Sequence, residues 1–262
     1  MGLSLAIMSR KGGVGKTTTA VTVGHGLALR GYRVLVVDLD EQGHAGLMLT
    51  AQRVPGLRRW YYDNEPVESV LVEARPGLWL LPGDGTTSRV VLDLQSQPIG
   101  AQRFSETLAR LASGFDFALF DSAPSLNALQ IGGMLAADVV VIPAKLRYVD
   151  LSGVSDVLDV LDEVSRYSGR RPYYVLPTFF DRTTKETPSR LKELIGAVGK
   201  ERVLEPIPQD VKLSAAPGVG KTAWEYAPGC VGLTGYKTAG GYVGGYRSLV
   251  ERAEAWKEAM HG

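Results

Sequence analysis

The chain has 262 residues, of which 45% are hydrophobic, and its formal net charge at pH 7 is +1. This length and composition suit a globular protein with one large α/β domain over residues 1–262. No apolar run approaches the ~20 residues of a membrane span, and no signal segment precedes the first apolar run, so we expect a cytoplasmic protein. The near-neutral charge neither requires nor excludes a nucleic-acid partner. The single cysteine, Cys230, excludes an internal disulfide and any cluster that needs paired cysteines.

Strand-like and helix-like segments alternate along the chain, which predicts a mostly parallel, doubly wound sheet with helices on both faces. Short apolar runs predict strands at 3–8, 34–38, 78–81, 115–121, 139–142 and 173–176. Helical spacing predicts helices at 17–30, 101–111, 152–167, 188–198 and 248–260. Thr187 and Pro188 mark the start of one of them, as an N-cap and a first-turn proline. The last helix carries an apolar stripe of Leu249, Ala253, Trp256 and Met260.

Two segments interrupt this alternation. In residues 52–66, three arginines stand beside three aromatic residues: Arg53, Arg58, Arg59, Trp60, Tyr61 and Tyr62. Such a cluster suits contact with DNA, contact with a partner protein, or packing on the domain itself. Residues 228–245 are rich in glycine and tyrosine, and we expect a flexible surface loop there.

The most informative segment is residues 11–18, Lys-Gly-Gly-Val-Gly-Lys-Thr-Thr, between the first strand and the first helix. In such a turn, backbone N–H groups and the helix N-terminus form a cradle for phosphate. Lys16 reaches the terminal phosphates, and the Thr17 hydroxyl holds Mg²⁺. Arg10 stands where the ordinary pattern has glycine, and Lys11 follows it. A cation at this entrance reaches the phosphates of a facing subunit more easily than those of its own loop.

Carboxylates follow two of the predicted strands. Asp38 and Asp40 end the strand at 34–38, and Asp121 ends the strand at 115–121. Because ligands in doubly wound sheets bind beyond the C-terminal ends of the strands, these groups should converge beside the phosphate loop. Carboxylate oxygens suit Mg²⁺, often through water. We expect Asp121 to act as a Walker B acid, Asp38 to support the water shell of the metal, and Asp40 to orient the attacking water.

These motifs resemble those of the ParA/Soj partition ATPases, part of the deviant Walker A group of P-loop NTPases that includes MinD. The resemblance runs nearly end to end, and 38–45, 121–126, 178–184 and 207–217 carry it. It implies ATP and Mg²⁺ as cofactors, with Lys11, Lys16 and Asp40 in catalysis and Thr17, Asp38 and Asp121 at the metal. The implied nucleotide-binding residues are Lys11, Gly12, Gly13, Val14, Gly15, Lys16, Thr17, Thr18, Pro208 and Asp210.

The same resemblance implies a homodimer that forms on ATP and binds double-stranded DNA without sequence preference. It also implies a ParB-type partner that stimulates slow hydrolysis and releases the dimer. We take Arg190, Lys192 and Lys212 as candidates for DNA contacts, although the charge around them is mixed and a solvated surface explains it equally well. Asp210 stands where the family has asparagine, so it can accept a hydrogen bond from the base but not donate one.

Three other functions fit parts of the sequence. A MinD-like membrane ATPase needs a basic amphipathic C-terminal helix, whereas the helix here carries Glu251, Glu254 and Glu258. A bacterial tyrosine kinase has a related phosphate site and C-terminal tyrosines, for which Tyr236, Tyr242 and Tyr246 are candidates. The loops of those kinases generally lack a lysine at the position of Lys11. A nucleotide switch without turnover is the third, and Asp40 argues against it.

Overall fold

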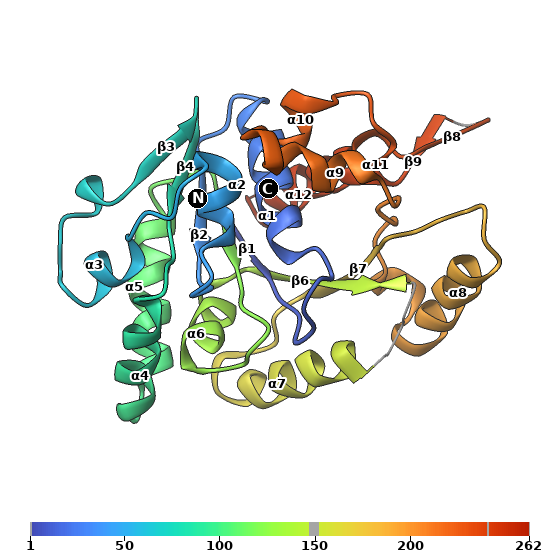
Figure 1. The fold of residues 1–262 in the computed structure, drawn as a ribbon. Coiled ribbons are helices and arrows are strands. Elements are labelled where there is room, and N and C mark those ends of the chain that lie inside the picture. The colour runs from blue at the N-terminus through green and yellow to red at the C-terminus, as the bar shows by residue number, and fades with distance from the viewer. Residues whose placement is uncertain (1, 147–151, 240, 262) are drawn as a thin grey trace.

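The structure is a computed structural model that describes residues 2–146, 152–239 and 241–261. Seven strands form one sheet in the order β3-β4-β2-β5-β1-β6-β7, in which every pair is parallel except β3 with β4. Helices cover both faces of this sheet (Figure 1), so the predicted doubly wound, mostly parallel architecture is confirmed. The strands are β1 (Leu3–Ile7), β2 (Val34–Asp38), β3 (Val72–Arg75), β4 (Leu78–Leu81), β5 (Phe117–Asp121), β6 (Val139–Lys145) and β7 (Tyr173–Thr178).

The helices follow the strands in alternation over most of the chain. They are α1 (Lys16–Ala28), α2 (His44–Thr50), α3 (Leu57–Tyr61), α4 (Thr87–Ser96), α5 (Gly100–Ala112), α6 (Ala128–Ala136), α7 (Ser152–Ser168), α8 (Glu186–Val198), α9 (Val211–Ala215), α10 (Ala223–Tyr226), α11 (Val231–Thr234) and α12 (Gly245–His261). Among the described residues, none of these helices is long and apolar enough to cross a membrane.

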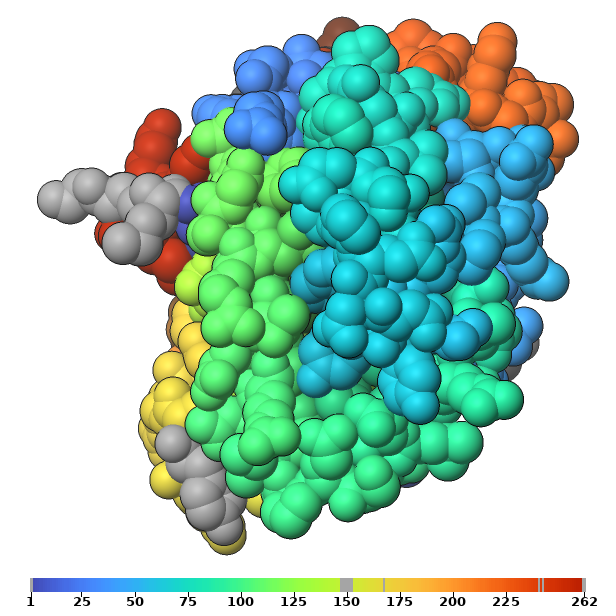
Figure 2. Space-filling model, turned by 90° about the vertical axis from the view of Figure 1, so that its left-hand side faces the viewer, coloured from blue at the N-terminus to red at the C-terminus, as the bar shows by residue number. Residues whose placement is uncertain are grey.

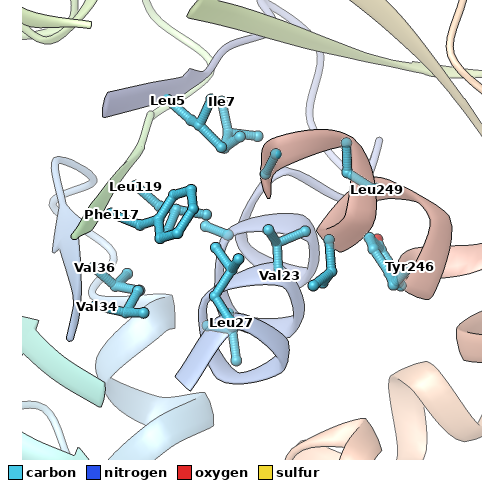
Figure 3. Packing of buried hydrophobic residues seen from close by; sticks show 14 of the residues in the cluster. Leu5, Ile7, Val23, Leu27, Val34, Val36, Phe117, Leu119, Tyr246 and Leu249 are labelled. Carbon is cyan, nitrogen blue, oxygen red and sulfur yellow. The ribbon is translucent and has the colours of Figure 1, made fainter. Parts of the chain in front are cut away.

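Two apolar layers hold the helices to the sheet. On one face, α1 lies between the strands and α12, with Val23 and Leu27 directed toward strand side chains such as Phe117, as Figure 3 shows. On the other face, residues of α4 to α8 pack on the opposite sides of the same strands. The central strands are buried on both faces because parallel sheets of this kind are covered twice, which is why they appear in the sequence as continuous apolar runs.

The sequence placed six strands of the sheet and five helices within a few residues, and it did not predict α2, α3, α4, α6, α9, α10 or α11. It missed β3, a short antiparallel edge strand whose side chains are only half-buried and therefore leave no apolar run. It also misplaced the start of α8, which begins at Glu186 with Lys185 as its N-cap. Thr187 lies inside the first turn instead, where its hydroxyl donates to the carbonyl of Asp181 and accepts from the backbone N–H of the same residue.

The expectation that residues 228–245 form a loop without regular elements is wrong, whereas their flexibility stays a prediction. The segment contains α11 and an antiparallel hairpin of β8 (Tyr236–Thr238) and β9 (Gly241–Val243). Its glycines allow close approach: Gly244 has a φ of +81°, and a Cβ there would lie 2.3 Å from the carbonyl oxygen of Pro206. The Tyr236 hydroxyl donates to the carbonyl of Phe180 at 3.0 Å. The glycines that suggested a loop therefore allow this segment to pack closely against the chain at Pro206.

The tyrosines of this region are mostly structural. Tyr246 is 1% exposed, and its hydroxyl is hydrogen-bonded to Thr19 of α1 at 3.0 Å. The structure does not describe the side chain of Tyr242. A tyrosine buried in this way is not available as a phosphorylation site, which weakens the tyrosine-kinase interpretation.

The C-terminal helix is part of the core. α12 begins at Gly245, three residues before the predicted start, and Leu249, Ala253 and Trp256 are buried as the stripe predicted. Met260, however, is 46% exposed, because it lies beyond the end of the sheet-covering turns. The indole of Trp256 stacks on the ring of Tyr174 with 4.7 Å between centroids. The apolar face of this helix therefore packs on other elements of the same chain.

The segment rich in arginine and aromatic residues packs on its own chain. It forms a layer beside the elements of residues 85–135 on the face shown in Figure 2. Leu57 is fully buried, and Tyr61 packs edge-to-face on Phe104 with 5.0 Å between centroids. Arg59 binds both carboxylate oxygens of Glu65. Of the three roles that the sequence allowed for this segment, the contacts favour packing on the domain.

A polar network fastens α10 to the edge of the sheet. Arg75 of β3 donates to both carboxylate oxygens of Glu225, and Glu225 also accepts the backbone N–H of Thr222 at 2.7 Å. The Thr222 hydroxyl is bonded to His25 of α1 at 2.7 Å. The hydrogen bonds from Arg75 lower the pKa of Glu225 to about 2, from its ordinary 4.5. Burial lowers the pKa of His25, which favours its neutral form.

This network predicts a pH-dependent contribution to stability. Because the pKa of Glu225 is depressed by folding, its contribution is present above pH 4.5 and is lost as the pH falls toward 2. Glu225→Gln keeps the oxygen that accepts from Thr222 but removes the charge, and should cost about 1 kcal/mol at pH 7 because the pair is partly exposed. Urea unfolding at pH 7, 5 and 3 should show the difference narrowing with acidity. Glu251→Gln, in the more exposed pair with Arg30, should change stability far less at every pH.

Candidate nucleotide-binding site

The loop of residues 11–18 joins β1 to α1 and has the backbone that a phosphate cradle needs. Gly13 and Gly15 have φ values of +67° and +96°, a region that side chains other than glycine rarely adopt. Gly15 is also the N-cap of α1, so the first N–H groups of the helix face the loop. A Cβ built on Gly12 or Gly13 would meet nothing within 4 Å, so the space over the loop is open.

Lys16 is buried beneath this loop. Its ammonium donates to the backbone carbonyl of Lys11 at 2.8 Å, which places it across the loop. Burial lowers its pKa, and the nearby carboxylates of Asp121 and Asp40 act in the opposite direction. A cation that is removed from bulk water but flanked by carboxylates remains available to attract phosphate oxygens.

The side chain of Lys11 does not lie in the same place as that of Lys16. Its stem packs against Gly153 in the first turn of α7, where an added Cβ would lie 3.1 Å from three of its side-chain carbons. Arg10 forms an ion pair with Asp156 one turn later in α7, at 3.5 Å. Among the described residues, Lys11 is not part of the walls around the open space over the loop. Its stem thus lies against α7 of its own chain, and the action of Lys11 on a facing subunit stays a prediction.

Asp121 is a buried carboxylate that fits a role beside a metal ion. Within the described residues, neither of its carboxylate oxygens has a hydrogen-bond partner of good geometry, although the Thr17 hydroxyl lies close by, and an unsatisfied buried acid is costly. Burial raises its pKa to about 7, whereas the neighbouring Thr17 hydroxyl and Lys16 draw the pKa down. Hard oxygen donors with unused lone pairs are the donor set that Mg²⁺ takes, so the residues present fit this ion.

Asp38 lies beside Asp121 on the adjacent strand, but both oxygens of its side chain already accept backbone hydrogen bonds. One carboxylate oxygen accepts the N–H of Asp40 at 3.0 Å, and the other accepts the N–H of Ala45 at 2.9 Å. Burial raises the pKa of Asp38 well above its usual range, with the charge of Asp121 next in effect. These contacts make Asp38 the organiser of the loop that carries Asp40. The support that Asp38 gives to the metal site would therefore be indirect.

Asp40 is the carboxylate that faces the open space over the loop. It is 7% exposed and accepts the N–H of Gln42 at 3.0 Å with one oxygen. The loop that carries it is packed tightly, because a Cβ on Gly83 would lie 2.5 Å from the carbonyl of Asp38 and 2.7 Å from that of Asp40.

The three predicted acids therefore do converge on the edge of the sheet where the phosphate loop lies. Among the described residues, no group of three or more acidic, histidine or cysteine side chains holds a metal alone, so any ion would share ligands with phosphate and water.

Two pockets open beside the loop and share the wall residues Gly15, Thr18, Leu213 and Ser214. The larger, the loop pocket, has a volume of about 660 Å³ and includes Lys16, Thr17, Asp40 and His44 in its walls. The smaller, the side pocket, has a volume of about 150 Å³. Its remaining walls are Thr178, Phe179, Ile207, Pro208, Gln209, Asp210, Val211 and Tyr246. The loop pocket contains the lysine, hydroxyl and carboxylate groups that suit phosphates, and the adjoining side pocket has several apolar walls that suit a base.

Pro208 and Asp210 lie in the side pocket, but Asp210 differs from the expected role. One of its carboxylate oxygens accepts the N–H of Lys212 as the N-cap of α9, at 2.9 Å. The other accepts the N–H of Gly232 in α11, at 3.0 Å. Both oxygens thus hold the protein together, and the carboxylate acts as a structural clamp more than as a base-reading group.

Among the described residues, no contact joins the three basic candidates for DNA binding into one cluster. Arg190 and Lys192 are exposed on α8, and Arg190 is paired with Glu193 of the same helix at 2.7 Å. Lys212 is exposed on α9, next to the nucleotide pockets. Exposure is compatible with phosphate contact, and the assignment stays a prediction.

Several residues of the site were not found from the sequence. The Thr178 hydroxyl at the end of β7 donates to the carbonyl of Val14 at 2.9 Å and so ties β7 to the phosphate loop. The Ser122 hydroxyl donates to the carbonyl of Ile7 at 2.8 Å and ties the loop after β5 to β1. The position of each at a strand end was a signal that could have been used. For Tyr246 in the side pocket no local signal exists, because its place depends on contacts distant in the sequence.

A glycine-rich loop between strand and helix, a buried lysine, and acids at the ends of two adjacent strands define a P-loop ATPase of the deviant Walker A type. A family model described as an AAA domain matches residues 3–171. The chromosome-partitioning ATPase Soj of Thermus thermophilus is 35% identical over 239 residues, which cover 89% of this chain and 92% of that protein. The chain belongs to the ParA/Soj family of partition ATPases.

A second relative agrees with this assignment, and two solved structures have a similar fold. The chromosome partitioning protein ParA of Caulobacter vibrioides is 33% identical over 241 residues, 88% of this chain and 90% of that protein. Cobyrinic acid a,c-diamide synthase from Mycobacterium smegmatis, solved with an ATP analog and magnesium, is 28% identical with a TM-score of 0.74, over 82% of this chain and 90% of that one. The McdA(D38A)–ATP complex from Cyanothece shares the fold, with a TM-score of 0.78 at 22% identity, over 99% of this chain and 96% of that one.

Proposed function

We propose that this chain, as a single ATPase domain, forms a homodimer on binding ATP and that the dimer binds double-stranded DNA without sequence preference. A ParB-type partner would then stimulate hydrolysis and release the dimer. The observation that carries the proposal is the phosphate loop with a second lysine, Lys11, at its start. It is supported by the similarity to Soj and ParA over about nine-tenths of the chain.

In the proposed reaction, the loop and Lys16 bind the phosphates, and Lys11 of a facing subunit adds positive charge where negative charge develops. Thr17 and Asp121 would hold Mg²⁺, which neutralises phosphate charge when bound. Asp40 orients the attacking water, held by its hydrogen bond from Gln42. Asp38 and Thr178 keep the two loops in place.

The proposal predicts DNA binding that depends on ATP, on salt and on Lys11. A shift assay with a duplex of arbitrary sequence should show binding with ATP but not with ADP or without nucleotide. If a dimer makes about four phosphate contacts, its affinity should fall about 100-fold between 50 and 200 mM salt. Lys11→Ala should abolish the ATP-dependent shift.

The matched control is Arg10→Ala, which removes a neighbouring cation that pairs with Asp156 and should retain the shift. Loss of binding in both variants to the same extent would argue against a specific role for Lys11. Absence of DNA binding by the wild type with every nucleotide would contradict the partition proposal, and vesicle pelleting would then test the membrane alternative.

A further inference from the structure

The peptide group in front of Asp40 is held from both sides. It consists of the carbonyl of Leu39 and the N–H of Asp40. The N–H donates to a carboxylate oxygen of Asp38 at 3.0 Å, and the carbonyl accepts the side-chain amide of Gln130 at 3.0 Å. Among the described residues, no other group donates to the Leu39 carbonyl. The orientation of this peptide group, and with it the direction in which the Asp40 side chain leaves the backbone, therefore depends on Gln130.

Gln130 reaches Leu39 from α6, the helix that follows the loop after β5. It lies in the first turn of α6, and the side chain of the N-cap residue, Asn127, accepts the N–H of Gln130 at 3.4 Å. Gly133, one turn later, packs on the same leucine, because a Cβ there would lie 2.6 Å from a methyl carbon of Leu39. Helix α6 thus holds Leu39 by its side chain as well as by its carbonyl, and it connects the segment after β5 to the loop after β2.

The side-chain amide of Gln130 is only half satisfied. The residue is 1% exposed, and among the described residues its side-chain oxygen has no hydrogen-bond partner. An unpaired buried oxygen is unfavourable, and a methionine of similar volume would avoid it. That exchange would, however, leave the Leu39 carbonyl as the unpaired group instead. The hydrogen-bond donor of Gln130 is therefore the feature that an apolar side chain could not supply at this position.

Packing alone does not fix the Asp40 carboxylate. Asp40 lines the loop pocket and also a second pocket of about 490 Å³, the outer pocket, whose walls include Leu39 and Gln130. With space on two sides, the carboxylate would have more than one direction available if its peptide group could rotate. Small misplacements of a catalytic group lower the rate of reaction strongly, so this freedom must be removed for water to be positioned.

We propose that Gln130 is a positioning residue for ATP hydrolysis, which acts by fixing the peptide group in front of Asp40. This inference rests on the proposed function, in which Asp40 orients the attacking water. Within the part of the chain that the structure describes, Gln130 does not belong to the walls of the loop pocket. It should therefore affect the rate of hydrolysis and not the binding of ATP.

Single-turnover hydrolysis and ATP titration of the full chain, both with Mg²⁺, test this with Gln130→Met, which keeps the side-chain volume and removes the donor. Hydrolysis should slow about tenfold or more, whereas the affinity for ATP should be nearly unchanged. The melting temperature should change little, because one unpaired buried oxygen replaces another. Gln130→Asn is a second variant, which keeps an amide but withdraws it by one methylene, and it should slow hydrolysis likewise.

The matched control is Asn127→Ala, which removes the cap of the same helix without touching the Leu39 carbonyl. It should lower the melting temperature, since a lost N-cap destabilises a helix, yet leave hydrolysis near the wild-type rate. A double variant separates positioning from general loosening of the fold. Added to Asp40→Ala, Gln130→Met should slow the residual hydrolysis no further, because the group that it positions is gone.

The inference is overturned if Gln130→Met and Gln130→Asn hydrolyse ATP as fast as the wild type. It is also overturned if Gln130→Met slows hydrolysis by the same factor with and without Asp40, or if ATP affinity falls as much as the rate. A wild type that does not hydrolyse ATP, or an Asp40→Ala protein as active as the wild type, would instead overturn the proposed function and this inference with it.

Discussion

Replacing Asp40 by alanine is expected to reduce ATP turnover by about 10²–10⁴-fold, the range for loss of a group that positions or activates the reacting water. ATP binding should persist, because the loop, Lys16 and Asp121 are unchanged. Asp40 accepts one backbone N–H, from Gln42, so its removal should disturb the loop only locally. Phosphate release under saturating ATP and titration with a fluorescent ATP analogue measure the two quantities separately.

The control for this variant is Glu41→Ala, which removes an exposed carboxylate from the same loop and should leave turnover near the wild-type value. The Asp40→Ala protein should also remain bound to DNA with ATP, since the step that ends the ATP state is blocked. If Asp40→Ala turned over ATP like the wild type, the water-positioning role would belong to another residue.

Replacing Lys16 by alanine is expected to weaken ATP binding by about 100-fold or more, the cost of removing one partner from a buried set of charges. The ammonium lies under the loop and offsets the carboxylates of Asp121 and Asp40. Without it, two acids would face the phosphates with no fixed cation between them. Titration with ATP and Mg²⁺ measures the loss, and circular dichroism shows whether the variant is folded.

Lys11→Ala provides the contrast, because the two lysines of one loop are predicted to act on different subunits. The Lys11→Ala protein should bind ATP with nearly wild-type affinity while failing to dimerise, as sedimentation with ATP would show. If Lys11→Ala lost ATP affinity as severely as Lys16→Ala, both lysines would serve the phosphates of their own chain.

The sequence was sufficient for those parts of the site that follow from local pattern. β2 and β5 are apolar runs that each end at an acid, so their positions and the convergence of Asp38 and Asp121 could be predicted. The role of Asp210 could not, because its second partner, Gly232, depends on how α9 and α11 meet. An acid in a matching motif gives no indication that both of its oxygens are already bound.

The hairpin of β8 and β9 shows the same limit for the fold. Glycines that permit turning and glycines that permit close packing are identical in a sequence, and the difference lies in their partners. Gly244 donates its N–H to Glu205 at 2.7 Å, and Gly245 donates to the carbonyl of Pro206. Those partners lie some forty residues earlier in the chain, where no local pattern reveals them.

The strand order has a consequence for how this protein is synthesised. Of the strands in this sheet, β1 is synthesised before the others, but it acquires its two neighbours only when β5 and β6 have been made. The side pocket waits longer still, for residues 207–214 and for Tyr246 near the end of the chain. At ~5–20 residues per second, the nascent chain passes several seconds with its central strands unpaired. Because both pockets need residues from the last quarter of the sequence, nucleotide can stabilise the fold only after those residues have been made.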